Sequence, residues 1–286
     1  FLFALLAPLM ASSLASTAGR VAVVTGSNKG IGYCVAEQLI ESKQFARVIM
    51  ACRNEELGQQ AAKTLGGEYA HLDLSDATSI DQFADFVDSP AVGRLDCLVN
   101  NAGIAFKDSD PTKFEDQTKP TLNTNYFGTA RLTDRLLPLL RSSGETPQVV
   151  NVASMAGRLA QIKNPTLRSE FAAPTLTRER LNELVLQFEL DVAQGLHQAR
   201  GWGNSNYGFS KLAVISYTKM VAREEASSGS PVKVNCCCPG YCDTDMTSHR
   251  GPRSPSEGAR NAVLLALQAP GGYNGVFISD LNIAEW

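Results

Sequence analysis

The chain has 286 residues, of which 44% are hydrophobic and 19% are charged, with a formal net charge of -3 and an isoelectric point near 5.7. This composition is typical of a globular protein with a substantial core. Because the sequence has no basic run and no excess of positive charge, nucleic acid is excluded as an expected partner.

The first 18 residues carry no charge and begin with an almost wholly apolar stretch. We interpret residues 1–18 as a leader or a disordered N-terminus outside the predicted fold. About ten apolar residues are too few for a stable membrane span. Small residues at Ser16 and Ala18 would suit a cleaved targeting peptide, so a cytoplasmic location is expected unless the leader is a genuine organelle or secretory signal.

From residue 20 onward, short apolar runs alternate with helical patterns, which predicts a doubly wound α/β fold with a parallel sheet. The first run, residues 21–25, is typical of a strand buried on both faces. It leads into a glycine-rich loop and a helix, where backbone amides would hold a pyrophosphate; a plain tight turn is the alternative. The loop residues expected to contact a dinucleotide are Gly26, Asn28, Lys29, Gly30, Ile31 and Gly32.

A second strand, predicted at residues 48–51, ends at Cys52 and Arg53. At this position an acidic residue binds the ribose of NAD, whereas an arginine accommodates the 2′-phosphate of NADP. Here no acid precedes Glu55, and Lys29 adds a second cation from the glycine-rich loop. The sequence therefore predicts NADP(H) as the cofactor, the alternative being two cations that contact only solvent.

Two further strands are predicted at residues 69–72 and 95–99, and the second runs into polar side chains that would line an adenine pocket. A long helix then contains Asn125 and ends near residue 141. Amides within a helix usually face water, but a kinked or widened helix would turn Asn125 inward.

A fifth strand, residues 148–152, places Ser154 at the sheet edge where open α/β sheets bind ligands. Tyr207 and Lys211 stand four residues apart ahead of an apolar run. In a helix over residues 207–225 they share one face, and the cation is expected to lower the pKa of the tyrosine. Such a tyrosine can donate a proton to a carbonyl oxygen; a solvated helix face is the alternative reading.

The 53 positions that separate Ser154 and Tyr207 exceed a simple strand-to-helix connection. This segment has its own helical period after a possible cap at Thr177, and it ends in a cluster of glycine and tryptophan. We interpret residues 158–203, approximately, as a helical insertion over the sheet edge of a single domain.

The C-terminal part is predicted to contain a sixth strand at residues 232–237, a helix from the capping box at Ser254 to about residue 267, and a last strand at residues 275–278. Three of the seven cysteines are consecutive, at positions 236–238, and would alternate between the faces of a strand. This pattern favours buried thiols over a disulfide or zinc site. The three histidines are far apart in sequence, so no metal is expected.

Several motifs occur in the order and approximate spacing of one protein family, the short-chain dehydrogenases/reductases. They are Thr25-Gly26-x3-Gly30-x-Gly32, Asp73, Asn100-Asn101-Ala102-Gly103, Asn125, Ser154, Tyr207-x3-Lys211 and Pro239-Gly240. Residues 19–286 resemble this family as one Rossmann-type domain. The long segment before Tyr207 and the terminal Trp286 resemble most closely the monomeric NADPH-dependent carbonyl reductases. The resemblance implies a parallel sheet of seven strands and a monomer.

The resemblance also implies roles for individual residues. Tyr207 is expected to be the general acid, Lys211 to hold the nicotinamide ribose, Ser154 to bind the carbonyl oxygen and Asn125 to support a water beside Lys211. Further cofactor contacts are expected from Arg53, Asp73, Leu74, Asn101, Pro239, Gly240, Cys242, Asp243 and Thr244. Substrate contacts are expected from Ser154, Met155, Tyr241 and Met246, and Phe106, Lys107 and Gln117 match positions that hold glutathione conjugates.

The activity that the resemblance implies is reduction of aldehydes, ketones or quinones to alcohols with NADPH. Met155 and Tyr241 depart from the carbonyl reductase pattern and reshape the substrate wall. One alternative is a specific dehydrogenase for a steroid, retinoid or terpenoid alcohol. Another is a non-catalytic NADP-binding sensor, which the presence of all four expected catalytic residues disfavours.

Overall fold

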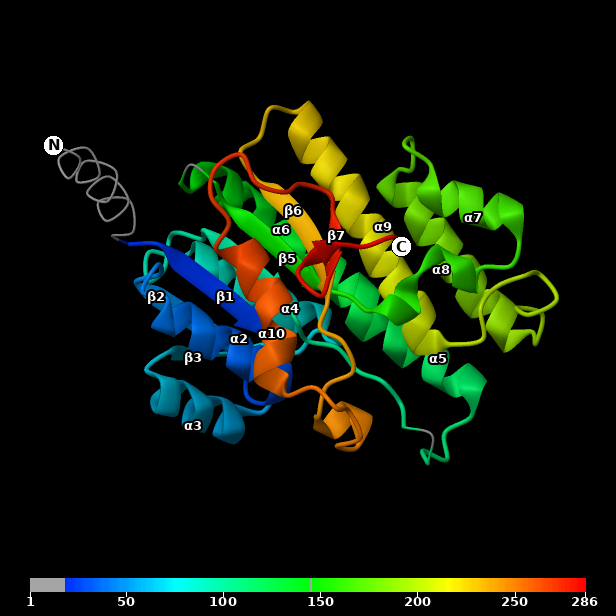
Figure 1. Cartoon of the computed structure of the whole chain (residues 1–286), viewed down its shortest axis with the longest axis horizontal. Helices are drawn as coiled ribbons and strands as arrows, with labels where there is room; N and C mark the ends of the chain where they lie inside the picture. Colours follow the sequence, from blue (N-terminus) through cyan, green and yellow to red (C-terminus); the bar gives the residue numbers. More distant parts are fainter. Residues whose placement is uncertain (1–18, 108, 145) are drawn as a thin grey trace, which may run out of the picture.

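The computed structural model describes residues 19–107, 109–144 and 146–286, so the predicted leader lies outside the described residues. Within these residues, eight strands form one sheet in the order β3-β2-β1-β4-β5-β6-β7-β8 (Figure 1). The strands are β1 (Val21–Thr25), β2 (Arg47–Cys52), β3 (Glu68–His71), β4 (Cys97–Asn100), β5 (Gln148–Val152), β6 (Lys233–Cys238), β7 (Phe277–Ser279) and β8 (Asn282–Ile283).

The first seven strands are parallel, which confirms the predicted sheet. The eighth strand was not predicted from the sequence and pairs antiparallel with β7. Asp280 and Leu281 join β7 to β8, and both have positive φ angles, 50° and 63°. Two consecutive residues of this conformation suit a tight hairpin, which explains the reversal at the sheet edge.

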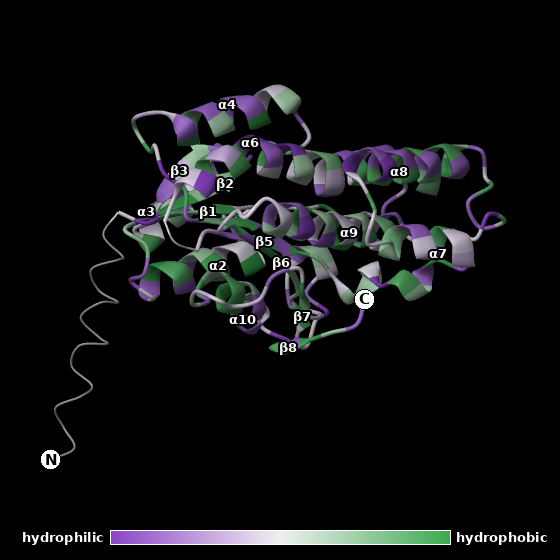
Figure 2. Cartoon of the chain, turned by 90° about the horizontal axis from the view of Figure 1, so that it is seen from above, coloured by the Kyte–Doolittle hydropathy of each residue, from purple (hydrophilic) through white to green (hydrophobic). Residues whose placement is uncertain are grey.

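Helices cover both faces of the sheet (Figures 1 and 2). Side chains along β1 alternate between two hydrophobic cores: Val21 and Val23 belong to one, Ala22 and Val24 to the other. The first core also contains apolar residues of α4 (Ala77–Asp88), α6 (Thr129–Ser142) and α9 (Asn206–Ser227), and the second those of α2 (Gly30–Glu41), α3 (Glu55–Leu65) and α10 (Pro255–Ala266). Burial on both faces explains why the central strands are continuous apolar runs.

The helices of the described chain are α2 (Gly30–Glu41), α3 (Glu55–Leu65), α4 (Ala77–Asp88), α5 (Phe114–Leu122), α6 (Thr129–Ser142), α7 (Pro165–Ala172), α8 (Arg178–Ala193), α9 (Asn206–Ser227) and α10 (Pro255–Ala266). The capping box predicted at Ser254 is confirmed, because Ser254 and Glu257 bond reciprocally at the start of α10. None of the helices in the described part of the chain has both the length and the apolar character needed to cross a bilayer.

Between α5 and α6 the chain forms a π-helical segment, Asn123–Gly128. The predicted long helix is therefore confirmed, together with the widening that turns Asn125 inward; Asn125 is buried. At the end of this segment, a side chain at position 128 would collide with the backbone carbonyl of Leu74. Glycine there lets the widened helix pack directly against the loop that follows β3.

The chain between β5 and α9 contains α7 and α8, which flank α9 (Figure 1). Thr177 caps α8, as predicted, by accepting a hydrogen bond from the backbone N–H of Arg180. Aromatic rings hold α8 on α9: Phe188 stacks on Phe209 with ring centres 3.8 Å apart, and Trp202 meets Phe209 edge-on at 5.5 Å. This cluster buries the apolar face of α8 against the helix that carries Tyr207 and Lys211.

Candidate active site

Tyr207 is the second residue of α9, and its neighbours fix the first turn of that helix. Ser205 caps the helix by accepting a hydrogen bond of 2.9 Å from the backbone N–H of Gly208. The Asn206 side chain donates to the carbonyl of Phe114 and accepts from the hydroxyl of Thr118, each at 2.8 Å. Contacts with α5 therefore set where Tyr207 stands.

Ser154 lies just beyond β5, at the carboxyl edge of the sheet. Its hydroxyl accepts a hydrogen bond from the backbone N–H of Ala156, which begins a 3₁₀ turn at Met155–Gly157. A Cβ at Gly157 would lie 2.7 Å from the backbone of Lys211, so the turn packs closely on α9. The Ser154 side chain lies close enough to Tyr207 to act on its phenol, whose pKa it lowers. The fold thus brings together two residues that are 53 positions apart.

Lys211 is buried, with 5% of the residue exposed. Its ammonium donates a hydrogen bond of 2.8 Å to the carbonyl of Val152, at the end of β5, and lies 5.7 Å from the centre of the Tyr207 ring. Burial penalises the charged form and lowers the pKa of Lys211 to about 8. The amine is therefore partly neutral near that pH.

The expected lowering of the tyrosine pKa is wrong for the protein alone. Burial raises the pKa of Tyr207 to about 12, although the Ser154 side chain acts in the opposite direction. Lys211 is not among the groups that shift it, and its ammonium is hydrogen-bonded to Val152. Spacing along the helix was predicted correctly, but it does not reveal the loss of water around the phenol, which is the largest cause of the shift.

The Asn125 amide is held by backbone and side-chain partners. Its oxygen accepts from the N–H of Ile104 at 2.7 Å, and its nitrogen donates to the carbonyl of Ile104 and to the hydroxyl of Ser210, each at 2.9 Å. Gly103 lies between Asn125 and Lys211, because a Cβ there would be 3.1 Å from the amide oxygen and 3.5 Å from the ammonium. Asn125 therefore fixes the loop after β4 against α9.

The glycine-rich loop has the shape that a dinucleotide requires. Gly26 and Gly30 have φ angles of 65° and 59°, which favour glycine. A side chain at Gly32 would collide with the carbonyl of Gly26 and with the amide of Asn101, which itself donates to the carbonyls of Thr25 and Gly26. The buried hydroxyl of Ser27 has no hydrogen-bond partner among the described residues. The backbone can approach a pyrophosphate at the start of α2, so the residues fit a dinucleotide.

Two side chains predicted to bind the cofactor phosphate lie at the glycine-rich loop, Lys29 within it and Arg53 after β2. Arg53 is 71% exposed in its side chain and lies 3.8 Å from the carboxylate of Asp73, a loose ion pair. Lys29 donates to Asp245 at 2.5 Å, and both side chains are largely exposed. Since exposed ion pairs are weak, either cation can exchange its carboxylate for a phosphate.

The segment after β6 approaches the glycine-rich loop from the other side. A Cβ at Gly30 would lie 3.5 Å from the methyl group of Thr244. His249 bridges Asp243 and Asp245 with bonds of 2.7 and 3.0 Å, and these carboxylates raise the pKa of His249. The predicted cofactor residues Cys242, Asp243 and Thr244 therefore lie in a segment that packs beside the glycine-rich loop.

At the base of this segment, Arg253 lies against Gly240, donates to the carbonyl of Pro239 at 3.1 Å and pairs with Asp280 at 2.6 Å. Another predicted cofactor residue, Leu74, lies away from the segment that follows β6, in the loop after β3. Arg253 thus anchors the predicted Pro239-Gly240 turn to the hairpin between β7 and β8.

The predicted substrate residues divide into two groups. Tyr241 and Met246 are 52% and 41% exposed, and Met155 follows Ser154 directly. The predicted conjugate-binding residues lie in or near the segment between β4 and α5. Of these, Gln117 donates its amide to the carbonyl of Thr112 at 2.7 Å, and Lys107 is exposed.

All seven cysteines are free thiols in the described chain, as predicted. Cys236 and Cys238 belong to one hydrophobic cluster and Cys237 to another, which confirms that they alternate between the faces of β6. Burial raises the pKa of Cys236 to about 12. Residues 19–107, 109–144 and 146–286 contain no cluster of three or more His, Cys, Asp or Glu side chains suited to a metal ion.

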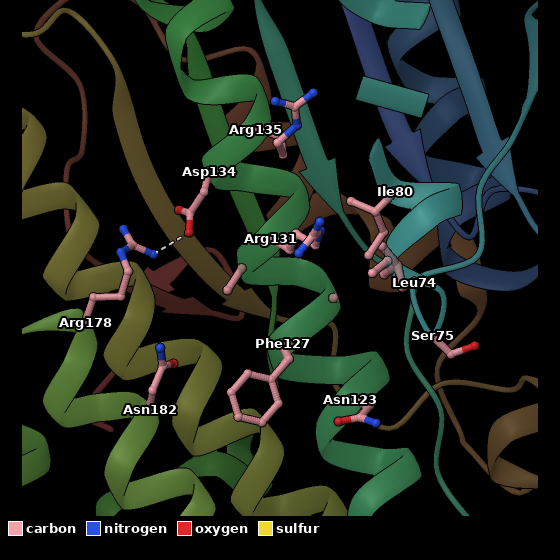
Figure 3. A pocket seen from close by; sticks show the side chains of 13 residues that line it. Leu74, Ser75, Ile80, Asn123, Phe127, Arg131, Asp134, Arg135, Arg178 and Asn182 are labelled. Atoms are coloured by element: carbon pink, nitrogen blue, oxygen red, sulfur yellow. Dashed lines mark hydrogen bonds and ion pairs between the residues drawn. The ribbon is translucent and has the colours of Figure 1, made fainter. Parts of the chain in front are cut away.

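A pocket of about 640 Å³ lies away from this site, between α4, α6 and α8 (Figure 3). Its wall includes three arginines, each paired with an acid: Arg131 with Asp81, Arg135 with Asp85 and Arg178 with Asp134. Leu74 is the single predicted site residue on its wall, and none of the expected catalytic residues lines it. The pocket is therefore separate from the expected catalytic residues.

Sequence reasoning assigned no role to three residues beside the site. Gly103 separates Asn125 from Lys211, Ser210 binds the Asn125 amide, and Gln161 contacts both the Ser154 turn and α9. Ser210 lies within the Tyr207–Lys211 motif and could have been noticed there. Gln161 carries no local signal, because its partner in α9, Gly208, is distant in sequence.

A family model described as short chain dehydrogenase matches residues 20–183 and 193–254. The chain belongs to the short-chain dehydrogenase/reductase family, and it is an oxidoreductase of that family similar to carbonyl reductases. Carbonyl reductase [NADPH] 1 of Mus musculus is 40% identical over 95% of this chain and 100% of its own length. The human protein of the same name is 39% identical over 93% and 98%, and carbonyl reductase [NADPH] 3 of Mus musculus is 37% identical over 95% and 100%.

Two solved structures have the same fold. Salutaridine reductase from Papaver somniferum matches with a TM-score of 0.81 and 30% identity, over 90% of this chain and 99% of that protein. Menthone neomenthol reductase from Mentha piperita matches with a TM-score of 0.76 and 30% identity, over 90% and 97%. These matches agree with the parallel Rossmann-type sheet described above.

Proposed function

We propose that this protein reduces carbonyl compounds to alcohols with NADPH and that Tyr207 is the proton donor. One observation carries the proposal: the phenol of Tyr207, the hydroxyl of Ser154 and the ammonium of Lys211 converge beside β5 at the carboxyl edge of the sheet. The names of the mammalian relatives, carbonyl reductase [NADPH], support the same reaction.

The chemical roles of Ser154 and Tyr207 in this proposal follow from their hydroxyl groups, which can donate hydrogen bonds. The Ser154 and Tyr207 hydroxyls would both donate to one carbonyl oxygen, which polarises the carbonyl and stabilises the negative charge that develops on oxygen. When bound, the reduced nicotinamide supplies the hydride that reaches the carbonyl carbon. Tyr207 gives its phenolic proton to the oxygen, and the product is an alcohol.

Lys211 has two roles in this proposal. Its ammonium stabilises the phenolate that remains after Tyr207 has given up its proton, because opposite charges close together favour the charged form. The same ammonium would hold the ribose next to the nicotinamide. Asn125 supports this arrangement by fixing the loop at Ile104 and the hydroxyl of Ser210, one residue before Lys211.

The choice of NADPH rests on charge. Arg53 and Lys29 flank the region where the adenosine 2′-phosphate would lie, and Arg53 follows the second strand where NAD-binding proteins place an acid. Both cations are exposed and held only by single carboxylates in weak pairs. A phosphate with two negative charges would replace those carboxylates.

The test is NADPH oxidation by the full chain, followed at 340 nm against a panel of quinones, aldehydes and ketones. Turnover of at least one class, with NADPH preferred over NADH, is the expected result. No turnover of any class by folded protein that binds NADPH would contradict the proposal.

A second candidate is a reductase specific for one cyclic ketone of the terpenoid or alkaloid type. The two solved structures favour it, because their names are those of reductases for such plant compounds. Exposed Tyr241 and Met246 offer apolar surface to a ring system. Adding menthone and a steroid ketone to the panel separates this candidate, which predicts that one cyclic ketone is reduced far faster than small quinones and aldehydes.

A further inference from the structure

We infer that Gln161 is a positioning residue that sets the distance between Ser154 and Tyr207; this inference rests on the proposed function. Gln161 ends a short 3₁₀ turn, Leu159–Gln161, that follows the Ser154 turn. Its side chain reaches two elements that carry the expected catalytic hydroxyls. It touches neither hydroxyl itself.

The Gln161 side-chain nitrogen joins the two elements directly. It donates to the carbonyl of Ala156 at 2.9 Å and to the carbonyl of Gly208 at 3.1 Å. Ala156 lies two residues after Ser154, and Gly208 lies one residue after Tyr207. A third carbonyl, that of Arg158, lies at 3.3 Å. One amide group therefore spans from the turn of Ser154 to the first turn of α9.

The orientation of the amide follows from its partners. Carbonyl oxygens can only accept hydrogen bonds, so the side of the amide that faces Ala156 and Gly208 must be the NH₂ group. The opposite atom, the amide oxygen, is buried and has no hydrogen-bond donor among the described residues. It packs against Gly203 and Gly208, where a Cβ would lie 3.0 and 3.2 Å away. Neighbouring glycines thus leave room for the glutamine and hold it in place.

The Met155–Gly157 turn and α9 are in close contact. A Cβ at Gly208 would lie 3.0 Å from the carbonyl of Ala156, and a Cβ at Gly157 would lie 2.7 Å from the backbone of Lys211. Packing limits how closely the turn approaches α9, and the Gln161 bonds stop it from moving away. Ser154 and Tyr207 must bind one carbonyl oxygen together, so their separation affects kcat more than cofactor binding.

The experiment compares wild type with Gln161→Leu, which keeps similar volume and removes both donors. We expect kcat to fall about 10-fold or more, since a small misplacement of catalytic groups is costly, while the KM for NADPH changes less than about 2-fold. The kcat of Gln161→Glu should be lower still near pH 8, because a carboxylate repels the carbonyl oxygens. This kcat should recover partly near pH 6, where the carboxylate takes up a proton. Unchanged kcat in Gln161→Leu would overturn the inference.

The matched control is Gln268→Leu. The Gln268 amide also donates two bonds across elements, to the side chain of Gln148 and to the carbonyl of Tyr273. Gln148 begins β5, so this bridge lies at the opposite end of the strand from Ser154. The Gln268→Leu variant should retain the kcat of wild type. Equal losses in the two variants would mean that Gln161 supports only the fold, and would overturn the inference.

Crystal structures separate this inference from the proposed function. If wild type reduces no carbonyl compound, the proposed function fails, and the position of the turn decides the inference alone. A shift of the Met155–Gly157 turn away from α9 in Gln161→Leu, with α9 unmoved against α5, supports the inference. Superimposable turns in the variant and wild type would overturn it.

Discussion

The ammonium of Lys211 lies 5.7 Å from the centre of the Tyr207 ring, and burial shifts the pKa values of both residues toward their neutral forms. The phenol is raised to a pKa of about 12 and the amine is lowered to a pKa of about 8. Near neutral pH the phenol is therefore protonated and the amine is mostly charged. This combination suits a proton donor that stands beside a stabilising cation.

The first prediction concerns pH. Lysine is charged below its pKa, so kcat/KM for carbonyl reduction should be constant up to about pH 7 and should fall as the pH rises through about 8. Tyr207 stays protonated over this range because its pKa is higher. A pH–rate profile with saturating NADPH measures this. Activity that stays constant to pH 10 would show that the charge on Lys211 is not required.

The second prediction concerns cofactor choice. Arg53→Asp should lower kcat/KM for NADPH by about 10- to 100-fold, since it removes one charged hydrogen bond to phosphate and places a negative charge there. The kcat/KM for NADH should fall only slightly or should rise. Arg260→Asp on α10 makes the same charge change outside the predicted site and should leave the ratio unchanged. An unaltered ratio in Arg53→Asp would remove the charge argument for NADP.

The third prediction concerns the glycine between Asn125 and Lys211. The Cβ of Gly103→Ala would lie 3.1 Å from the Asn125 oxygen, so the Asn125 amide must shift by a few tenths of an ångström, whereas the 3.5 Å to the Lys211 ammonium is an ordinary contact. We expect kcat to fall about 10-fold, as for other small displacements of catalytic groups. The control is Gly144→Ala, whose Cβ would meet the flexible Arg94 side chain at 3.2 Å and should leave kcat unchanged. Equal kcat in Gly103→Ala and wild type would contradict this account of Gly103.

The fourth prediction concerns stability of the segment before α9. Asp191 is 1% exposed and accepts hydrogen bonds from Trp202 at 2.7 Å and from Gln187 and Arg200. Asp191→Ala leaves the buried indole N–H without an acceptor, so the free energy of unfolding should drop by about 3 kcal/mol. Urea denaturation of this variant and of Glu189→Ala, a more exposed neighbour, gives the comparison. A drop in Asp191→Ala no larger than in the control would contradict the prediction.

Much of the fold could be predicted from the sequence because buried parallel strands are continuous apolar runs and helices carry caps. The glycine-rich loop was predicted from its glycines and the alternation of Cys236–Cys238 from the period of a strand, while the widened helix at Asn125 was one of two alternatives. The strand β8 was missed because its two residues carry no pattern. Single-sequence periodicity has nothing to detect in so short an element.

The electrostatics of the site could not be predicted in the same way. The spacing of Tyr207 and Lys211 is a property of one helix, whereas burial of the phenol depends on packing from other elements. Gln161 was missed for a related reason, since its acceptors lie in the Ser154 turn and in α9. Residues that act through tertiary contacts leave no mark in local spacing.

The measurement that bears most directly on the central claim is the single-turnover rate of carbonyl reduction by Tyr207→Phe with saturating NADPH. Loss of the phenolic proton should lower this rate by about 10²- to 10⁴-fold while NADPH still binds with nearly wild-type affinity, and Tyr273→Phe should retain full activity. A Tyr207→Phe rate equal to that of wild type would contradict the claim that this phenol delivers the proton.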